Sequence, residues 1–152
     1  MTRLVLDTNI LIQVVRGKAL ATDVKALIDG IENPELYLSV VSLVEAESLA
    51  IKWKWQNQKI TSLKNLMDSL ICIDITANQK ELLEAYVRLD AYSQSKGTDD
   101  SGKMLQGSSR NMGKNDLWIA ATTYALDAEL ITMDGDFDHL KDIWFPIHKF
   151  KI

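Results

Sequence analysis

The chain has 152 residues, of which 47% are hydrophobic and 25% are charged, so its length and composition fit one globular domain with a buried core. Its net charge of −4 argues against tight, metal-independent binding of nucleic acid, because phosphate contacts usually require an excess of Lys and Arg. No stretch has membrane-spanning length and no secretory leader is recognisable. We therefore expect a cytoplasmic protein with no membrane association.

The first two thirds of the chain alternate apolar runs with helical patterns. In chain order, the patterns predict a strand at 3–6, helices at 10–16 and 19–31, a strand at 36–41, helices at 42–55 and 58–70, a strand at 71–75 and a helix at 76–95. Ser42 and Thr76 are expected to begin their helices, because a hydroxyl can accept a hydrogen bond from a free amide of the first turn. The single Cys72 lies in an apolar run and is expected to be reduced and buried.

The last third of the chain begins with a segment rich in Gly and Ser. Residues 97–113 predict a long mobile loop inside a single domain of residues 1–152, not a linker between two domains. A mostly apolar helix is expected at 115–126, followed by strands at 129–132 and 144–148. Pro146 places the last strand at an edge of the sheet, because proline cannot donate to a strand ladder.

This alternation of strands and helices predicts an α/β fold with a mostly parallel sheet covered by helices on both faces. Ligands bind such sheets at the carboxyl ends of the strands. Four acids are expected at that edge: Asp7 at the end of the first strand, Glu45 just after the second, Asp134 just after the fourth, and Asp116 at the start of the helix that leads into the fourth.

Neighbouring carboxylates repel one another unless a cation lies among them. Oxygen ligands suit Mg²⁺ and Mn²⁺, and such ions can activate water and neutralise charge on a phosphoryl group. The four acids therefore indicate a metal-dependent phosphodiesterase site. Each acid also has an ordinary structural explanation: Asp7 as a helix N-cap, Glu45 in a capping box with Ser42, Asp116 as a complement to a helix dipole and Asp134 in a turn.

Four motifs, taken together, resemble one known family. They are Leu6-Asp7-Thr8-Asn9-Ile10-Leu11, Ser39-Val40-Val41-Ser42-Leu43-Val44-Glu45, Asn115-Asp116-Leu117-Trp118-Ile119-Ala120-Ala121-Thr122 and Leu130-Ile131-Thr132-Met133-Asp134-Gly135-Asp136-Phe137. In this order they resemble the PIN domain family, and within it the VapC-type ribonuclease toxins of bacteria. The resemblance implies a three-layer α/β/α sandwich on a five-stranded parallel sheet of order 3-2-1-4-5.

The resemblance also implies an activity, namely Mg²⁺- or Mn²⁺-dependent endonucleolytic cleavage of RNA that leaves 5′-phosphate and 3′-hydroxyl ends. The implied catalytic and metal-binding residues are Asp7, Glu45, Asp116 and Asp134. Asp136 is a nearby acid that could supplement or replace Asp134 as a ligand. The implied supporting polar residues are Asn9, Ser42 and Asn115.

Partners are implied by the same resemblance: an RNA substrate, a second copy of the chain in a homodimer, and an antitoxin protein that inserts a segment into the active site. The Gly/Ser-rich segment and its border carry three cations, Lys103, Arg110 and Lys114. They could contact an RNA backbone or an acidic partner, or they could belong to a solvated loop tip. Lys52-Trp53-Lys54-Trp55 could stack on bases, but we favour a dimer or partner surface for it.

Three rival interpretations are weighed against this one. A haloacid dehalogenase would need an aspartate where Asn9 stands, and a receiver module would need an acidic pair after the first strand. The third rival is a PIN-like domain that binds RNA or protein without cutting.

A metal-dependent route does not require His139 or His148. Phe137 is expected in the core.

Overall fold

The computed structural model describes residues 1–151 and has a five-stranded parallel sheet at its centre. The strands are β1 (Thr2–Leu6), β2 (Pro34–Ser39), β3 (Ile71–Ile73), β4 (Glu129–Thr132) and β5 (Ile147–Lys149). Their order, β3-β2-β1-β4-β5, confirms the predicted topology. All strands point the same way, so their carboxyl ends meet at one edge, which we call the carboxyl edge.

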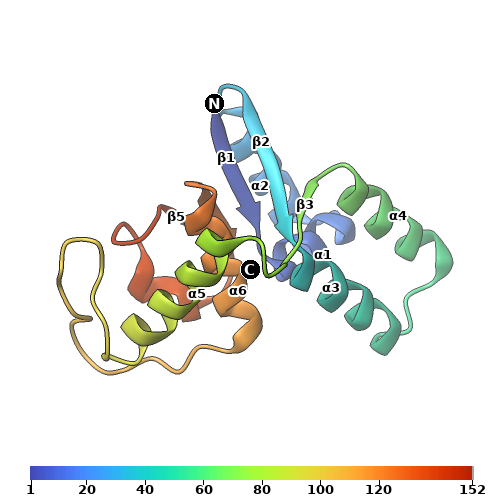
Figure 1. Ribbon diagram of the computed structural model, residues 1–152. Coiled ribbons are helices and arrows are strands. Elements are labelled where there is room, and N and C mark those ends of the chain that lie inside the picture. The colour runs from blue at the N-terminus through green and yellow to red at the C-terminus, as the bar shows by residue number, and fades with distance from the viewer. Residues whose placement is uncertain (152) are drawn as a thin grey trace.

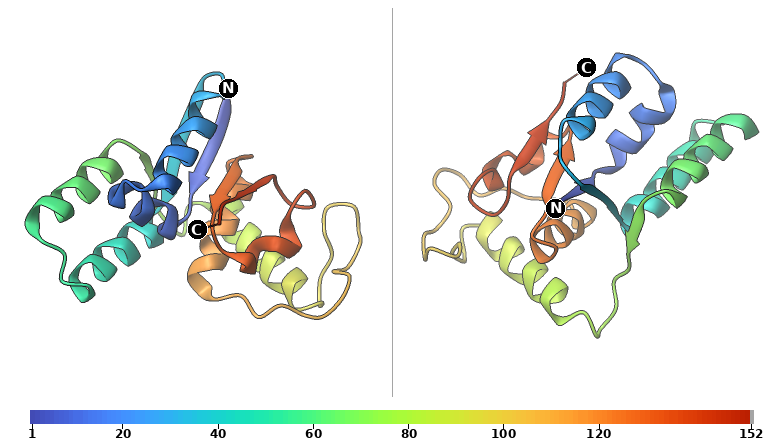
Figure 2. Two further views of the ribbon diagram at one scale, coloured as in Figure 1. Left: turned by 180° about the vertical axis from the view of Figure 1, so that it is seen from behind. Right: turned by 90° about the horizontal axis from the view of Figure 1, so that it is seen from above.

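Helices cover both faces of the sheet, as the predicted α/β fold requires (Figures 1 and 2). They are α1 (Thr8–Arg16), α2 (Ala19–Asp29), α3 (Val40–Lys52), α4 (Asn57–Asp68), α5 (Lys80–Ser93), α6 (Lys114–Ala125) and the short 3₁₀ helix η1 (Gly135–Leu140). Figure 1 shows α3 and α4 projecting to one side of the sheet and α5 and α6 packed on the other side. Within residues 1–151, no helix is both long enough and apolar enough to cross a bilayer.

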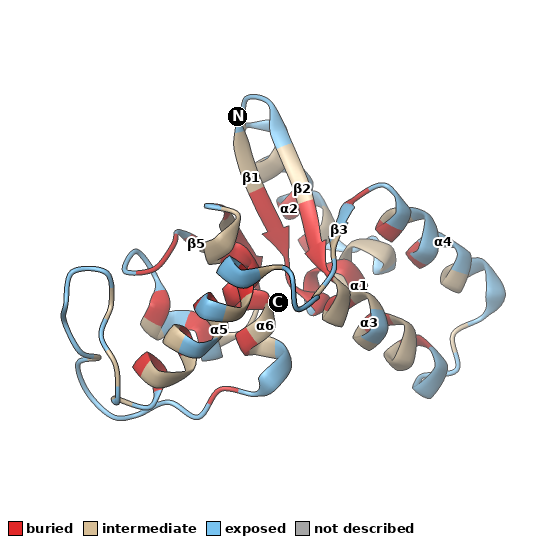
Figure 3. Cartoon of the chain, viewed as in Figure 1, coloured by how far each residue is buried: buried red, intermediate tan, exposed pale blue. Residues whose placement is uncertain are grey.

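The central strand β1 explains why the molecule has two cores. Its residues Leu4, Val5 and Leu6 are almost completely buried, as the red segment of β1 shows in Figure 3. Successive side chains of a strand point to opposite faces. Val5 packs into one apolar cluster with α5 and α6, whereas Leu4 and Leu6 pack into a second cluster with α1, α2 and α4.

The junction between β2 and α3 differs from the prediction. The strand was expected to reach Val41, but it ends at Ser39, whose hydroxyl accepts a hydrogen bond from the Val41 amide at 3.3 Å and caps the helix. Ser42 therefore lies inside the helix and is fully buried. The predicted capping box of Ser42 and Glu45 is wrong, because Ser39 already provides the cap.

Two further expectations about the middle of the chain are wrong. Cys72 is exposed, because β3 is a three-residue strand at the sheet edge with little cover. Thr76 does not begin a helix; its amide donates to the Gln79 side chain at 2.8 Å, and α5 begins only at Lys80.

The end of the chain follows the prediction more closely. The last strand begins at Ile147, three residues later than expected, and it lies at the sheet edge as Pro146 indicated. Phe137 is fully buried in the core, as expected.

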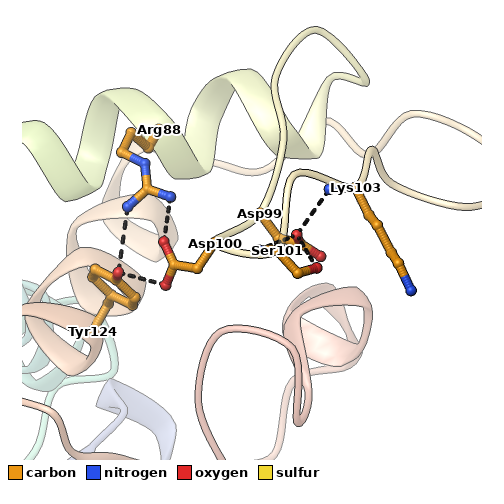
Figure 4. Close-up of polar contacts among 6 residues, drawn as sticks. All are labelled: Arg88, Asp99, Asp100, Ser101, Lys103 and Tyr124. Carbon is orange, nitrogen blue, oxygen red and sulfur yellow. Dashed lines mark hydrogen bonds and ion pairs between the residues drawn. The ribbon is translucent and has the colours of Figure 1, made fainter.

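The Gly/Ser-rich segment 97–113 is a loop, as expected, but several contacts fix it to the domain (Figure 4). The Asp100 carboxylate pairs with the Arg88 guanidinium of α5 and accepts a hydrogen bond from the Tyr124 hydroxyl of α6 at 2.6 Å. Asp99 accepts hydrogen bonds from the amides of Ser101 and Lys103 and so closes a tight turn. The loop is anchored in its second half as well, where the Arg110 amide donates to the Ser93 carbonyl at 2.6 Å, in contrast to the mobile loop that its composition suggests.

Candidate active site

A groove of about 740 Å³ opens at the carboxyl edge of the sheet and continues along α3. Four carboxylates line it, each brought there by a different element: Asp7 by the end of β1, Glu45 by α3, Asp116 by the first turn of α6 and Asp134 by the turn after β4. The four elements meet because the strand ends share one edge and α6 begins there.

Asp7 is held in one orientation by hydrogen bonds to both of its carboxylate oxygens. Oδ1 accepts from the Thr8 amide at 2.8 Å and Oδ2 accepts from the Thr132 hydroxyl at 2.7 Å. The side chain is 4% exposed. Burial raises the pKa of Asp7 to about 6 despite these two hydrogen bonds, and the negative charges of Asp134 and Glu45 add to the rise.

Asp116 lies at the point where the acids crowd most. Burial is the largest cause that raises its pKa to about 7, followed by the charges of Asp7, Asp134 and the other acids around it. Carboxylate oxygens of Asp116, Asp134 and Asp136 all lie within 4.8 Å of one another. We call Asp7, Glu45, Asp116, Asp134 and Asp136 the acidic cluster.

Glu45 reaches the cluster from α3 and is oriented by Asn115, which the sequence resemblance implied as a supporting polar residue. The Asn115 side-chain amide donates to Glu45 Oε2 at 3.0 Å, so an interaction from α6 fixes a carboxylate of α3. Among residues 1–151, no Lys, Arg or His forms an ion pair with a member of the acidic cluster. The negative charge is therefore uncompensated by the protein.

The donor set of the cluster fits a hard divalent cation. Two oxygens on opposite sides of a Mg²⁺ ion lie about 4.2 Å apart, because each lies roughly 2.1 Å from the metal. Oxygens on adjacent corners of the octahedron lie about 3.0 Å apart, so the three oxygens within 4.8 Å must draw closer together to bind one ion. An all-oxygen set with no thiol or imidazole suits Mg²⁺ or Mn²⁺ rather than a softer metal.

Two residues of the site were missed by the sequence analysis. The Thr132 hydroxyl donates to Asp7 and accepts from the Asp134 amide at 3.0 Å, so it links the acids that follow β1 and β4. The Thr8 hydroxyl donates to the buried Ser42 hydroxyl at 3.0 Å and ties α1 to α3. The sequence signal that could have found Thr132 is its position as a polar residue at the end of an apolar strand.

The remaining predicted site residues divide into two groups. Asn9 and Asn115 line the groove, whereas Ser42 supports it from behind. Lys103 and Arg110 line a separate hollow beside the loop, bounded by His139, and the structure does not bring them to the acidic cluster. Lys114 is exposed at the start of α6, next to Asn115, and does not line the groove.

Some of the ordinary structural explanations for the acids hold together with the clustering. Asp7 is the N-cap of α1, Asp134 is the N-cap of η1, and Asp116 stands in the first turn of α6. The clustering is an additional property, because caps of separate helices have no need to converge on one groove.

The sequence profile of the PIN domain matches residues 4–143. The chain belongs to the PIN domain family. A search among curated proteins finds no match for this PIN domain. The match spans all four elements that carry the acidic cluster.

Solved structures with the same fold include two VapBC proteins and one VapC toxin. VapBC2 from Rickettsia felis, bound to a DNA fragment from its promoter, is 22% identical with a TM-score of 0.71 and covers 99% of this chain and 100% of that chain. VapBC-1 from nontypeable Haemophilus influenzae is 23% identical, with a TM-score of 0.68 and coverages of 97% and 98%. VapC20 from Mycobacterium tuberculosis, a toxin that cleaves the sarcin–ricin loop, is 18% identical, with a TM-score of 0.56 and coverages of 89% and 92%. These similarities establish the PIN fold.

Proposed function

We propose that this PIN domain is an endoribonuclease that depends on Mg²⁺ or Mn²⁺ and acts as the toxin of a toxin–antitoxin pair. The observation that carries the proposal is the acidic cluster, in which five carboxylates from four parts of the chain meet without a basic partner. A bound divalent ion compensates such a cluster, whereas a purely structural role would favour ion pairs with Lys or Arg.

The residues of the chain have distinct proposed roles. Asp116, Asp134 and Asp136 hold the metal through the oxygens that lie within 4.8 Å, and Asp7 and Glu45 complete the charge of the groove. When bound, the metal supplies an acidified water and neutralises charge on the phosphoryl group. Thr132 holds Asp7 in position, and the Asn115 amide holds Glu45.

The two histidines have other contacts, which agrees with a route that does not use them. His148 pairs with Glu129 on the edge strand, and His139 hydrogen-bonds to the buried Ser93 hydroxyl at 2.8 Å. Neither lines the groove. General acid–base cleavage of RNA by a histidine pair would require both in one site.

The proposed partners follow from the relatives and from the groove. Another solved structure of this fold is a toxin–antitoxin complex from Klebsiella pneumoniae. One wall of the groove is apolar and includes Val44, which is 60% exposed on α3. We propose that an antitoxin covers this wall and blocks the acids, and that two copies of the chain form a homodimer.

The experiment is cleavage of a mixed RNA pool by wild type, Asp7→Asn and the control Asp68→Asn, each with Mg²⁺, Mn²⁺ or EDTA. Asp68 is exposed at the end of α4 and outside the groove, so its variant should cut like wild type. Asp7→Asn keeps the shape of the side chain and should lose cutting. Glu45→Gln provides a second test should Asp7→Asn fail to fold. Folded wild type that cuts under no metal would instead indicate a binding domain.

A further inference from the structure

The end of the molecule formed by the turn between α3 and α4 differs in charge from the rest of the chain. Residues 8–22 and 48–67 contain no Asp or Glu, and they carry Arg16, Lys18, Lys52, Lys54, Lys59 and Lys64. The remaining positions hold eleven of the seventeen Lys and Arg against all twenty-one Asp and Glu. The net charge of −4 therefore hides a basic end on an otherwise acidic protein.

Structure brings these two segments together. Arg16, at the end of α1, lies over the Trp53 ring with its guanidinium carbon 5.0 Å from the ring centroid. The Lys59 ammonium lies 4.5 Å from the centroid of Trp55. We call Arg16, Lys52, Trp53, Lys54, Trp55 and Lys59 the basic tip. Within residues 1–151, none of its cations has a carboxylate partner, so their charge is available to a ligand.

The two tryptophans of the basic tip are presented by a hydrogen-bonded turn. Lys54 has a φ of 56°, and the Trp55 amide returns to the Ala50 carbonyl at 2.9 Å, which closes the end of α3. Trp53 is 45% exposed, and its ring centroid lies 6.1 Å from that of Trp55. Beside Trp55 is a hollow of about 490 Å³ that is lined by amide, hydroxyl and ammonium groups. Aromatic faces held in place next to cations suit unpaired nucleic-acid bases.

The basic tip is continuous with the acidic cluster. The groove that contains Asp7 and Asp116 is also lined by Val41, Ser48 and Lys52, which follow one face of α3. Eleven residues of helix separate Val41 from Lys52, or about 16 Å at roughly 1.5 Å per residue. Figures 1 and 2 show α3 and α4 projecting together away from the sheet, so the tip lies at the far end of this path.

We propose that the basic tip binds single-stranded RNA beside the cleavage site, with phosphates on Lys52 and Lys54 and an unpaired base on Trp53. The RNA backbone runs along α3 from the acidic cluster to the tip. This proposal rests on the proposed nuclease function, because the acidic cluster defines which RNA segment reaches the tip. It replaces the partner surface that the sequence pattern favoured, since the unpaired cations and the continuity with the groove suit a polyanion.

The experiment measures the affinity of the protein for a labelled oligouridylate about twelve nucleotides long by fluorescence anisotropy. It is run in EDTA and repeated with Mg²⁺, at several salt concentrations between about 50 and 200 mM. The variants are Trp53→Ala, Trp53→Phe and Lys54→Gln, with Lys141→Gln as the matched control. Lys141 is an exposed lysine after η1, away from α3 and α4. Thermal unfolding of each variant checks that it is folded.

We expect Trp53→Ala to weaken binding at least about fivefold, because stacking on the indole is lost, and Trp53→Phe to keep most of the affinity. Lys54→Gln should weaken binding and reduce the slope of log K against log salt by about 0.7, since one phosphate contact is removed. Lys141→Gln should match wild type. A merely structural role of the tip would leave the salt slope unchanged.

Equal affinity of wild type and all the tip variants, or no binding by wild type in either condition, would overturn the proposal. Tighter binding of an oligoglutamate peptide than of the RNA would also overturn it and assign the tip to an acidic protein partner. Because binding in EDTA requires no cleavage, the assay separates the two proposals. RNA bound at the tip by a protein that never cuts would keep the RNA contact of the tip but remove the nuclease, and with it the RNA path from the acidic cluster.

Discussion

Two groups of carboxylates in this molecule have opposite surroundings. Asp100 in the loop pairs with the Arg88 guanidinium and the Tyr124 hydroxyl, and these hydrogen bonds lower its pKa (Figure 4). Asp7 and Asp116 in the groove lie among other acids, and burial raises their pKa to about 6 and about 7. The first group is satisfied by the chain itself. The second group has no basic partner among residues 1–151.

Asp100 stabilises the folded state, whereas Asp7 and Asp116 lower its stability. A paired acid favours the folded state above its pKa, whereas a buried and unpaired acid must be protonated or compensated. Natural sites that trade stability for activity have this property. Four measurements test whether the two groups behave so differently.

The largest expected effect is on cleavage. Asp116→Asn should lower metal-dependent RNA cleavage at least about a hundredfold, because it removes a proposed ligand of the metal. The measurement is the cleavage rate with saturating Mn²⁺, and Asp100→Asn serves as the control at the other carboxylate group. Equal losses in both variants would show that the acids do not differ in the way proposed.

The second effect is stabilisation by metal. A divalent ion that binds only the folded state adds about 2.7 kcal/mol at a concentration one hundred times its Kd. For a chain of this length we expect Mn²⁺ to raise Tm by roughly 5 to 10 °C. The same rise should appear in Asp100→Asn and be absent in Asp116→Asn. An undiminished rise in Asp116→Asn would place the metal elsewhere.

The third effect is the pH dependence of the metal-free protein. Between about pH 4 and 7, folded Asp116 holds a proton that the unfolded chain releases, so the free energy of unfolding falls as pH rises. Asp116→Asn should therefore be more stable than wild type at pH 8, by about 1 to 2 kcal/mol after allowance for solvent screening. At pH 4 the two proteins should unfold alike. Chemical denaturation in EDTA at both pH values measures the difference.

The smallest effect is a change in the free energy of unfolding caused by a substitution in the loop. Its sign is opposite to that expected for Asp116→Asn. Asp100→Asn should lower the free energy of unfolding by no more than about 1 kcal/mol at pH 7, because the pair with Arg88 is largely exposed. The depressed pKa of Asp100 means that this contribution is present at neutral pH and is lost as pH falls toward 3. Urea unfolding of wild type and variant at both pH values gives the difference. A stabilising Asp100→Asn at pH 7 would contradict the comparison.

The sequence predicted the meeting of the acids because it depends on a topological rule. Strand ends in a parallel sheet share one edge, so the positions of Asp7 and Asp134 after apolar runs placed them together. Local patterns failed where tertiary contacts decide between similar residues. Ser39 and Ser42 are both possible caps, but Ser39 ends the pairing of β2 with β3 and Ser42 is buried against Thr8.

The features that could not be predicted are those made by unrelated segments. Nothing in the local sequence of Arg16 indicates that it lies over Trp53, thirty-seven positions later. In the same way, the composition of the 97–113 loop gave no sign that Asp100 reaches α5 and α6. Long-range side-chain contacts of this kind depend on packing, which periodicity and propensity do not encode.

The order in which the acids occur along the chain has a consequence for synthesis. Asp7 and Glu45 leave the ribosome early, but β1 pairs on one side with β4, and Asp116, Asp134 and Asp136 follow more than a hundred residues after Asp7. A nascent or truncated chain that stops before β4 contains neither the last neighbour of β1 nor the carboxylate oxygens of Asp134 and Asp136 that are proposed to bind the metal. The proposed nuclease can therefore form only after nearly the whole chain has been made.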